Sequence, residues 1–264
     1  MRIDVHTHAF HPKVAEKVVA QLQEHYGVVP SGTAMLEHLL SRVRAAGLDK
    51  AVVLNAATAP AQVIPANNWL INLKQNYPQL IPFGTLHPGF DRIEAELDRL
   101  ERNGIKGLKF HPEFQDFRMD DSEFLDLLEA TRNRFIVLFH VGDTLPPEEN
   151  PSCPFKMRRI VDRFPDMTVI AAHLGGYQHW KWSAQALAGS SAYLDTSSSL
   201  AFVDDETLHA IVDNHPRERL LFGSDYPLFD PVEEVVRLQQ RLGLSDEEFE
   251  TLLGNAAKLF PEEG

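Results

Sequence analysis

One pattern constrains the fold of this chain more than any other: short apolar runs alternate with amphipathic helical segments. The eight runs cover residues 2–8, 51–55, 80–87, 105–111, 135–141, 167–173, 192–196 and 219–225. Short runs that are apolar on both faces are typical of parallel strands buried on both sides. The segments that place apolar residues along one helical face are 33–46, 91–103, 121–133, 155–164, 205–214 and 232–242.

Strands that alternate with helices imply parallel βαβ units with right-handed crossovers. Eight such units favour a closed TIM-like (β/α)8 barrel, an α/β fold, over an open doubly wound sheet. The open sheet is the alternative, but no G-x-G-x-x-G motif follows the first run. The chain has 264 residues and no evident linker, so we predict a single barrel domain over residues 1–264. Residues 254–260 are expected to form a short helix that closes the barrel base.

Charge and composition exclude several classes of partner. The net charge of −13 is opposite to that of a nucleic-acid-binding surface and does not favour anionic membranes. No apolar run approaches the roughly 18 residues of a membrane span, and no signal peptide is evident. The single cysteine, Cys153, lies in a proline-rich stretch and cannot form an internal disulfide. We therefore expect a cytoplasmic enzyme that acts on a small molecule and binds neither nucleic acid nor membrane.

Histidines gather where the predicted strands end. Six of the twelve histidines occupy such positions: His6, His8, His87, His111, His140 and His173. Lys109 stands at the end of the fourth run, and Asp225 ends the eighth. The carboxyl ends of barrel strands form the face that carries the active site. The sequence therefore predicts a cluster of imidazoles, one carboxylate and one lysine at the barrel mouth.

Strand periodicity places His6 and His8 on one face, and Asp4 is expected on that face as a group that supports the ligands or fills a core layer rather than as a ligand. Imidazole and carboxylate groups are suitable ligands for zinc and other divalent first-row metals. Each residue alone has a plainer explanation, such as a buried core histidine, a turn cap for Asp225 or an ion pair for Lys109. The joint pattern favours a metal site with an open position for substrate.

Several motifs in order resemble one known superfamily. They are D-V-H-T-H at 4–8, G-T-L-H-P at 84–88, G-L-K-F-H-P at 107–112, F-H-V-G at 139–142, A-H-L-G-G at 172–176, Y-L-D-T-S at 193–197, G-S-D-Y-P at 223–227 and L-G-N-A-A-K-L-F at 253–260. The chain resembles the amidohydrolase superfamily. Its motifs are most similar to the amidohydrolase-related branch with aminocarboxymuconate semialdehyde decarboxylase and γ-resorcylate decarboxylase.

The resemblance implies roles for individual residues. His6, His8, His140 and Asp225 match the ligands of a single divalent metal, with zinc expected and manganese or another first-row ion as the alternative. His173 matches a histidine that positions the attacking water, and Asp225 would also act as general base. In members with two metals, Lys109 would be carboxylated and bridge the ions, while His140 and His173 would bind the second ion. One ion is expected, two are the alternative, and a homodimer is the expected assembly.

The sequence leaves the reaction open. The first hypothesis is a metal-dependent hydrolase that directs activated water at an amide, lactone or ester. The alternative is a non-oxidative decarboxylase of a small unsaturated or aromatic acid, and the remote alternative is a non-catalytic binding barrel. Candidates to line the substrate pocket are His87, His111, Tyr177, Trp180 and Ser197, although Trp180 could instead pack under its helix. Asp195 and the serines at 197–199 are candidates to orient the imidazoles.

Overall fold

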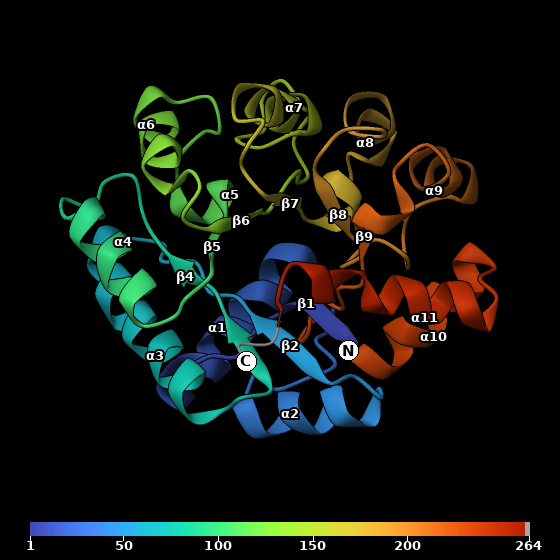
Figure 1. Ribbon diagram of the computed structural model, residues 1–264, viewed down its shortest axis with the longest axis horizontal. Coiled ribbons are helices and arrows are strands. Elements are labelled where there is room, and N and C mark those ends of the chain that lie inside the picture. The colour runs from blue at the N-terminus through green and yellow to red at the C-terminus, as the bar shows by residue number, and fades with distance from the viewer. Residues whose placement is uncertain (262–264) are drawn as a thin grey trace.

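Short parallel strands form the wall of a barrel in a computed structural model that describes residues 1–261 (Figure 1). The strands are β1 (Ile3–Thr7), β2 (Lys50–Val53), β3 (Leu80–Pro82), β4 (Gly84–Thr85), β5 (Gly107–Phe110), β6 (Ile136–Phe139), β7 (Val169–Ala171), β8 (Tyr193–Asp195) and β9 (Leu220–Leu221). Only Phe83 separates β3 from β4, and its N–H donates to the carbonyl of Val53 over 3.0 Å. The two short strands together form the third of the eight predicted runs.

Backbone hydrogen bonds join β1 and His8, which follows it, to residues 222–226 just after β9. Neighbouring strands pair in parallel in two sheets, β1-β2-β3 and β4 through β9. The N–H of Val5 donates to Phe222 (2.9 Å) and that of His8 to Tyr226 (2.7 Å). The N–H of Asp225 donates to His6 over 2.8 Å. The TIM-like fold is confirmed, and these hydrogen bonds place Asp225 beside His6 and His8.

Helices surround this wall (Figure 1). They are α1 (Pro12–Tyr26), α2 (Leu36–Ala45), α3 (Val63–Asn76), α4 (Ile93–Arg102), α5 (Pro112–Gln115), α6 (Ser122–Thr131), α7 (Pro154–Arg163), α8 (Trp180–Ala186), α9 (Asp205–Val212), α10 (Pro231–Leu242) and α11 (Asp246–Gly254). Short 3-10 turns cover Pro60–Gln62, His173–Gly175, Arg217–Arg219 and Asn255–Lys258. The six expected helices are α2, α4, α6, α7, α9 and α10. Within residues 1–261, no helix combines the length and apolar composition needed to cross a membrane.

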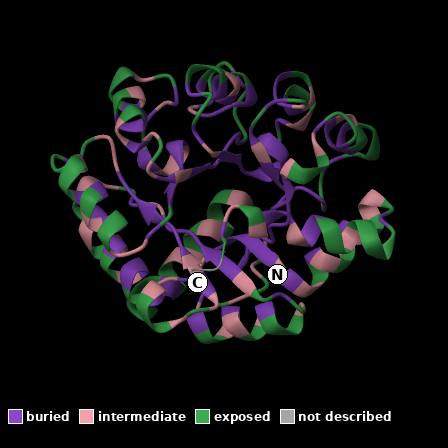
Figure 2. Cartoon of the chain, viewed as in Figure 1, coloured by how far each residue is buried: buried purple, intermediate pink, exposed green. Residues whose placement is uncertain are grey.

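The apolar core has two layers, one inside the barrel and one between the strands and the helices (Figure 2). The inner layer contains side chains such as Val5, Leu54 and Ile170. Ala256 and Phe260 from the C-terminal 3-10 turn and its flank belong to the same layer. The expected short helix therefore closes the barrel base. The predicted single domain includes residues 262–264, which lie outside the described residues, and its extent stays a prediction.

A register shift in β1 corrects one expectation from the sequence. Asp4 pairs with Ala51 and Thr7 pairs with Val53, so β1 advances three residues where β2 advances two. The extra residue breaks strict alternation, as in a β-bulge. Val5 therefore packs in the inner core while the next residue, His6, lines the cavity at the barrel mouth. Asp4 itself is not among the converging ligand atoms, as expected, and its Oδ1 accepts hydrogen bonds from the backbone N–H groups of His6 and Ser224 at 3.1 and 3.0 Å.

Candidate metal centre

Two imidazoles and one carboxylate converge at the barrel mouth. Nε2 of His8 lies 3.2 Å from Oδ1 of Asp225, and Nε2 of His6 lies 3.5 Å from the same oxygen. One ligand atom from each of the three residues falls within 4.8 Å of the others. Such a set of two nitrogens and one oxygen is suited to Zn²⁺ and to other divalent first-row ions.

The remaining ring nitrogens of these histidines face hydrogen-bond acceptors. Nδ1 of His8 lies 2.8 Å from the carbonyl oxygen of Leu54, and Nδ1 of His6 lies 3.0 Å from Oδ2 of Asp195. Each Nδ1 must carry its proton to donate to these oxygens, so each Nε2 keeps a lone pair. Metal-ligating histidines typically donate their second N–H to a carboxylate or carbonyl in this way. The residues therefore fit a divalent cation.

Asp195 is the carboxylate that fixes the ring of His6. Its Oδ1 accepts hydrogen bonds from the N–H groups of His173 and Ser197, each over 3.1 Å, and from the Ser197 hydroxyl. Burial alone would raise the pKa of Asp195, but nearby His6 and these hydrogen bonds outweigh it and lower the pKa to about 2. Asp195 is thus an anion at neutral pH. It faces the ring of His6, as expected for a residue named from the sequence as a candidate to orient an imidazole.

His140 lies beside this cluster rather than within the group of three. Its Nδ1 is 2.9 Å from Nε2 of His173, and its Nε2 is 2.9 Å from the carbonyl oxygen of Gly142. Its ring stacks on His111 with 3.8 Å between centroids, and a second group of candidate ligand atoms combines His140, His111 and Glu113. The two imidazoles expected to hold a second ion, His140 and His173, are therefore adjacent. The ring of His173, which contacts the fourth expected ligand, His140, also lies beside His6 with 5.0 Å between ring centroids.

Three of the buried histidines of the site, His6, His111 and His140, are neutral at physiological pH. Burial, followed by the charge of Lys109, lowers the pKa of His6 to about 4. Burial also lowers the pKa values of His111 and His140 well below their usual range. Neutral imidazole is the form that binds metal ions.

Lys109 is buried against the cluster, with its Nζ 3.4 Å from Nε2 of His6. Burial lowers the pKa of Lys109 to about 8, and the charges of Asp225 and Asp195 oppose that shift. Burial would raise the pKa of Asp225, but His6 and His8 hold it well below its usual range. Asp225 also adopts a left-handed backbone with φ of +65°, and the Ser198 hydroxyl donates to its Oδ2. A strained backbone of this kind is typical of functional sites.

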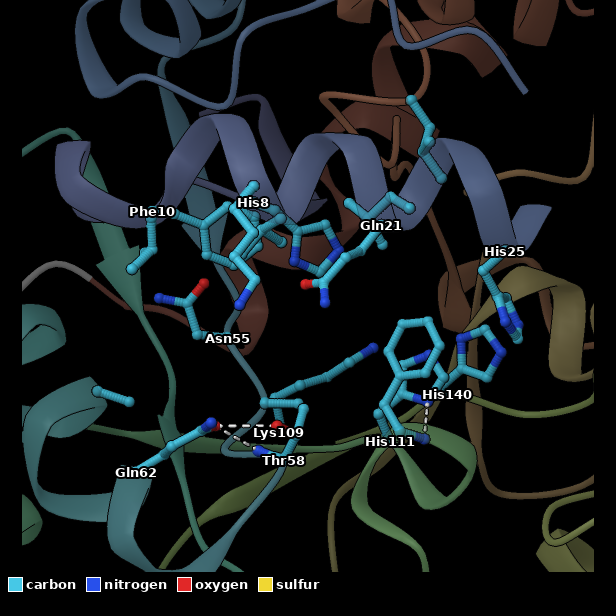
Figure 3. A pocket seen from close by; sticks show the side chains of 18 of the residues that line it. His8, Phe10, Gln21, His25, Asn55, Thr58, Gln62, Lys109, His111 and His140 are labelled. Carbon is cyan, nitrogen blue, oxygen red and sulfur yellow. Dashed lines mark hydrogen bonds between the residues drawn. The ribbon is translucent and has the colours of Figure 1, made fainter. Parts of the chain in front are cut away.

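A cavity of about 1070 Å³ opens above the cluster (Figure 3). Helix α1 covers one side of the cavity. Ala15 is the one buried residue of this helix, so α1 packs only lightly on the rest of the protein. The C-terminal end of α1 is attached to the site by two contacts. The hydroxyl of Tyr26 lies 3.1 Å from Nε2 of His111, and Nε2 of His25 lies 2.9 Å from Oδ2 of Asp143.

The five expected pocket residues divide into three groups. His111 lines the large cavity, and Tyr177 lines a smaller one beside it. Ser197 is fully buried, with its hydroxyl 3.0 Å from Nδ1 of His6 and 2.9 Å from Nδ1 of His173. Among the described residues, neither Trp180 nor His87 lines the large cavity. The indole N–H of Trp180 donates to the carbonyl of His173 over 3.1 Å, and Nδ1 of His87 accepts from the N–H of Gly89 over 3.0 Å.

Helix α1 and Asn55 contribute to the cavity but were not among the elements and site residues expected from the sequence. Signals for α1 were present, because Pro12 stands at the first helical turn and Gly27 ends the helix with φ of +66°. Val14, Val18 and Leu22 are spaced four residues apart and line the cavity. Asn55 follows the second predicted strand without any motif to mark it. Helix α1 adds an apolar wall to the cavity, and Asn55 adds a polar amide to it.

Comparisons with known proteins identify the family and the fold. A model of the Amidohydrolase family matches residues 3–261. No curated protein matches the chain in sequence. The fold is similar to 5-carboxyvanillate decarboxylase from Sphingomonas paucimobilis, with a TM-score of 0.71, 15% identity and 99% of both chains covered.

Two further solved structures share the fold. The 2,6-dihydroxybenzoate decarboxylase from Rhizobium has a TM-score of 0.71 and 15% identity, with 98% of each chain covered. A dihydroxybenzoic acid decarboxylase from a Polaromonas species has a TM-score of 0.70 and 14% identity, with 98% of this chain and 96% of that chain covered. The Polaromonas structure contains manganese and the inhibitor 2-nitroresorcinol.

Proposed function

This chain belongs to the amidohydrolase family, and from that premise we propose that it is a metal-dependent decarboxylase of a small aromatic carboxylic acid. Hydrolysis of an amide, lactone or ester was the first hypothesis from the sequence. The structural neighbours named above support the decarboxylase alternative better.

The observation that carries the proposal is the charge around the cavity. The whole chain has a net charge of −13, yet three lysines, Lys13, Lys17 and Lys109, line this cavity against two carboxylates, Glu24 and Asp225. Cations in a low-dielectric cleft attract and hold an anionic substrate. A decarboxylase substrate always carries a carboxylate, whereas an amide, lactone or ester need not be charged.

The cavity wall is suited to a planar ring. Phe10 stacks against His8 with 6.1 Å between ring centroids and an interplanar angle of 9°. Trp69 and Phe114 line the same cavity. Aromatic side chains such as these exclude water and favour stacked or edge-on contacts with a substrate ring.

We assign a divalent cation to His6, His8 and Asp225, with His140 beside them, and manganese as the first ion to test. The bound cation would hold substrate oxygens and stabilise negative charge as it develops. In the reaction the electron pair of the broken C–C bond stays on the ring carbon, carbon dioxide leaves, and the carbon takes up one proton. Asp225 belongs to the cluster and His173 borders it, and these are the groups that we expect to carry this proton. Two ions, a carboxylated Lys109, a homodimer and a cytoplasmic location stay predictions.

The test is a screen of the purified protein after chelation and reloading with Mn²⁺ or Zn²⁺. Hydroxylated benzoates are offered, and carbon dioxide release is followed together with loss of the acid. Esters, lactones and amides form the second arm, with release of new acid as the readout. We expect one carbon dioxide per acid consumed with an ion bound, and loss of most turnover in Asp225→Asn with the fold retained. Hydrolysis without carbon dioxide release would return the assignment to the hydrolase hypothesis. Stoichiometric metal without either activity would instead favour the non-catalytic binding barrel.

A further inference from the structure

One buried polar atom at the large cavity, Oδ1 of Asn55, has no hydrogen-bond partner within residues 1–261. Asn55 follows β2 and is 6% exposed, and Figure 3 shows its amide projecting into the space beneath α1. No residue in the described part of the chain hydrogen-bonds to its Oδ1, which is itself buried. A buried acceptor without a donor is costly, so such groups are rare unless a ligand or water satisfies them.

Other buried groups without a partner do not share this position. Within residues 1–261 they include Oδ2 of Asp4, Oδ1 of Asn150 and Nδ1 of His215, and none of these residues lines the large cavity. By contrast, the amide oxygen of Gln62, which also lines the cavity, is occupied by the N–H and hydroxyl of Thr58 at 2.8 and 3.0 Å. Asn55 is therefore the described cavity residue whose buried oxygen is left for a ligand.

The position of Asn55 relates it to the metal centre. Its neighbour Leu54 offers the carbonyl oxygen that lies 2.8 Å from Nδ1 of His8. Asn55 is thus the next residue after the one whose carbonyl oxygen orients the imidazole of His8. Phe10, Asn55 and the cluster line the same cavity, so a substrate whose carboxylate reaches the cluster can place its ring near Asn55.

The chemistry of the cavity selects the kind of donor. An amide oxygen accepts a hydrogen bond from a hydroxyl or an amine. Three lysines line the same cavity against the carboxylates of Glu24 and Asp225, and the proposed divalent cation would add two positive charges, so the loaded cavity would repel a protonated amine. A neutral hydroxyl can donate a hydrogen bond to Oδ1 of Asn55 and carries no positive charge, so the lysines of the cavity do not repel it.

We propose that Asn55 is a specificity residue that binds a hydroxyl group on the ring of the substrate; this rests on the proposed decarboxylase function. A site built to hydrogen-bond a hydroxyl discriminates strongly against the analogue that lacks it, because the buried acceptor is then left unpaired. The substrate class is therefore a hydroxylated aromatic acid whose hydroxyl meets Asn55, in addition to any oxygen held at the metal centre.

Binding measurements test this without turnover. Calorimetry with the Mn²⁺-loaded protein compares ortho-, meta- and para-hydroxybenzoate with benzoate and with the matching methyl ethers. We expect at least one hydroxybenzoate to bind about tenfold more tightly than its methyl ether, the effect of one buried hydrogen bond. Asn55→Ala should reduce the ratio of the two affinities, hydroxybenzoate over methyl ether, to about one. Asn55→Asp should keep this ratio, because an acceptor oxygen remains. Gln21→Leu, which removes a different amide along the same cavity, should keep the ratio as well.

The outcomes separate this inference from the proposed function. Loss of the ratio in Asn55→Ala alone, with an unchanged melting temperature, supports the role of Asn55 whether or not carbon dioxide is released. Carbon dioxide release together with an unchanged ratio in Asn55→Ala overturns the role of Asn55 and leaves the decarboxylase assignment standing. Failure of every hydroxybenzoate to bind better than its ether overturns the inference outright. If Asn55→Ala unfolds, loss of the ratio in a folded Asn55→Asp would equally contradict it.

Discussion

Replacement of Asp195 by asparagine should weaken metal binding without removing any metal ligand. The side chain is fully buried, and its Oδ2 faces Nδ1 of His6 at 3.0 Å. In Asp195→Asn the amide nitrogen can occupy that position and donate to Nδ1. The ring of His6 would then carry its proton on Nε2, the nitrogen that faces Asp225 at 3.5 Å. A protonated Nε2 cannot bind a cation, so the expected effect works through the tautomer of His6.

The magnitude follows from the contacts that change. The amide oxygen of asparagine can still accept from the N–H groups of His173 and Ser197, which now bond to Oδ1 at 3.1 Å each. One charge-assisted hydrogen bond, to His6, is lost, and such a bond contributes about 1.5–3 kcal/mol. At about 1.4 kcal/mol per factor of ten, the dissociation constant for Mn²⁺ should rise roughly ten- to hundredfold.

The assay is competition for Mn²⁺ against a chelator of known affinity, followed by thermal unfolding of the metal-free protein. Asp4→Asn is the matched control, because Asp4 is an equally buried carboxylate that accepts from the backbone of His6 and does not touch its ring. The control should bind Mn²⁺ within about threefold of the parent protein, well below the effect of one lost charge-assisted hydrogen bond. Unchanged affinity in Asp195→Asn, or equal losses in both variants, would refute the tautomer explanation.

Two other predictions concern the fold and helix α1. A Cβ on Gly107 would lie 2.4 Å from the ring of Phe83 inside the barrel, so Gly107→Ala should lower the free energy of unfolding by about 1–3 kcal/mol. Gly254→Ala, which meets nothing within 4 Å, should leave it unchanged or slightly higher in denaturant titrations. The hydrogen bond to Asp143 raises the pKa of His25, so this contact stabilises α1 below pH 6.5 and is lost as the pH rises through the raised pKa. Asp143→Asn should return the pKa of His25 toward its ordinary value in an NMR titration; an unmoved pKa would contradict this pairing.

The sequence by itself determined the barrel and the residue types at its mouth. Short apolar runs and amphipathic segments are local patterns, and parallel βαβ units can assemble in few ways, so the pattern constrained the topology. Because all strands of such a barrel end on one face, His6, His8 and Asp225 could be placed together although more than two hundred residues separate them. The same reasoning marked Asp195 as a group that orients an imidazole.

Only the tertiary structure decided which atoms face which. The register shift in β1 turned Asp4 toward the backbone, because one inserted residue reverses the alternation on which the sequence argument rested. Hydrogen bonds placed His140 against His173 rather than among the three ligand atoms, and packing set Trp180 away from the large cavity. Asn55 shows the reason most directly. No motif in the sequence marks its amide as functional. The amide oxygen is left without a partner at a cavity whose walls come from strands, loops and a helix far apart in the chain, and only the folded barrel brings these together.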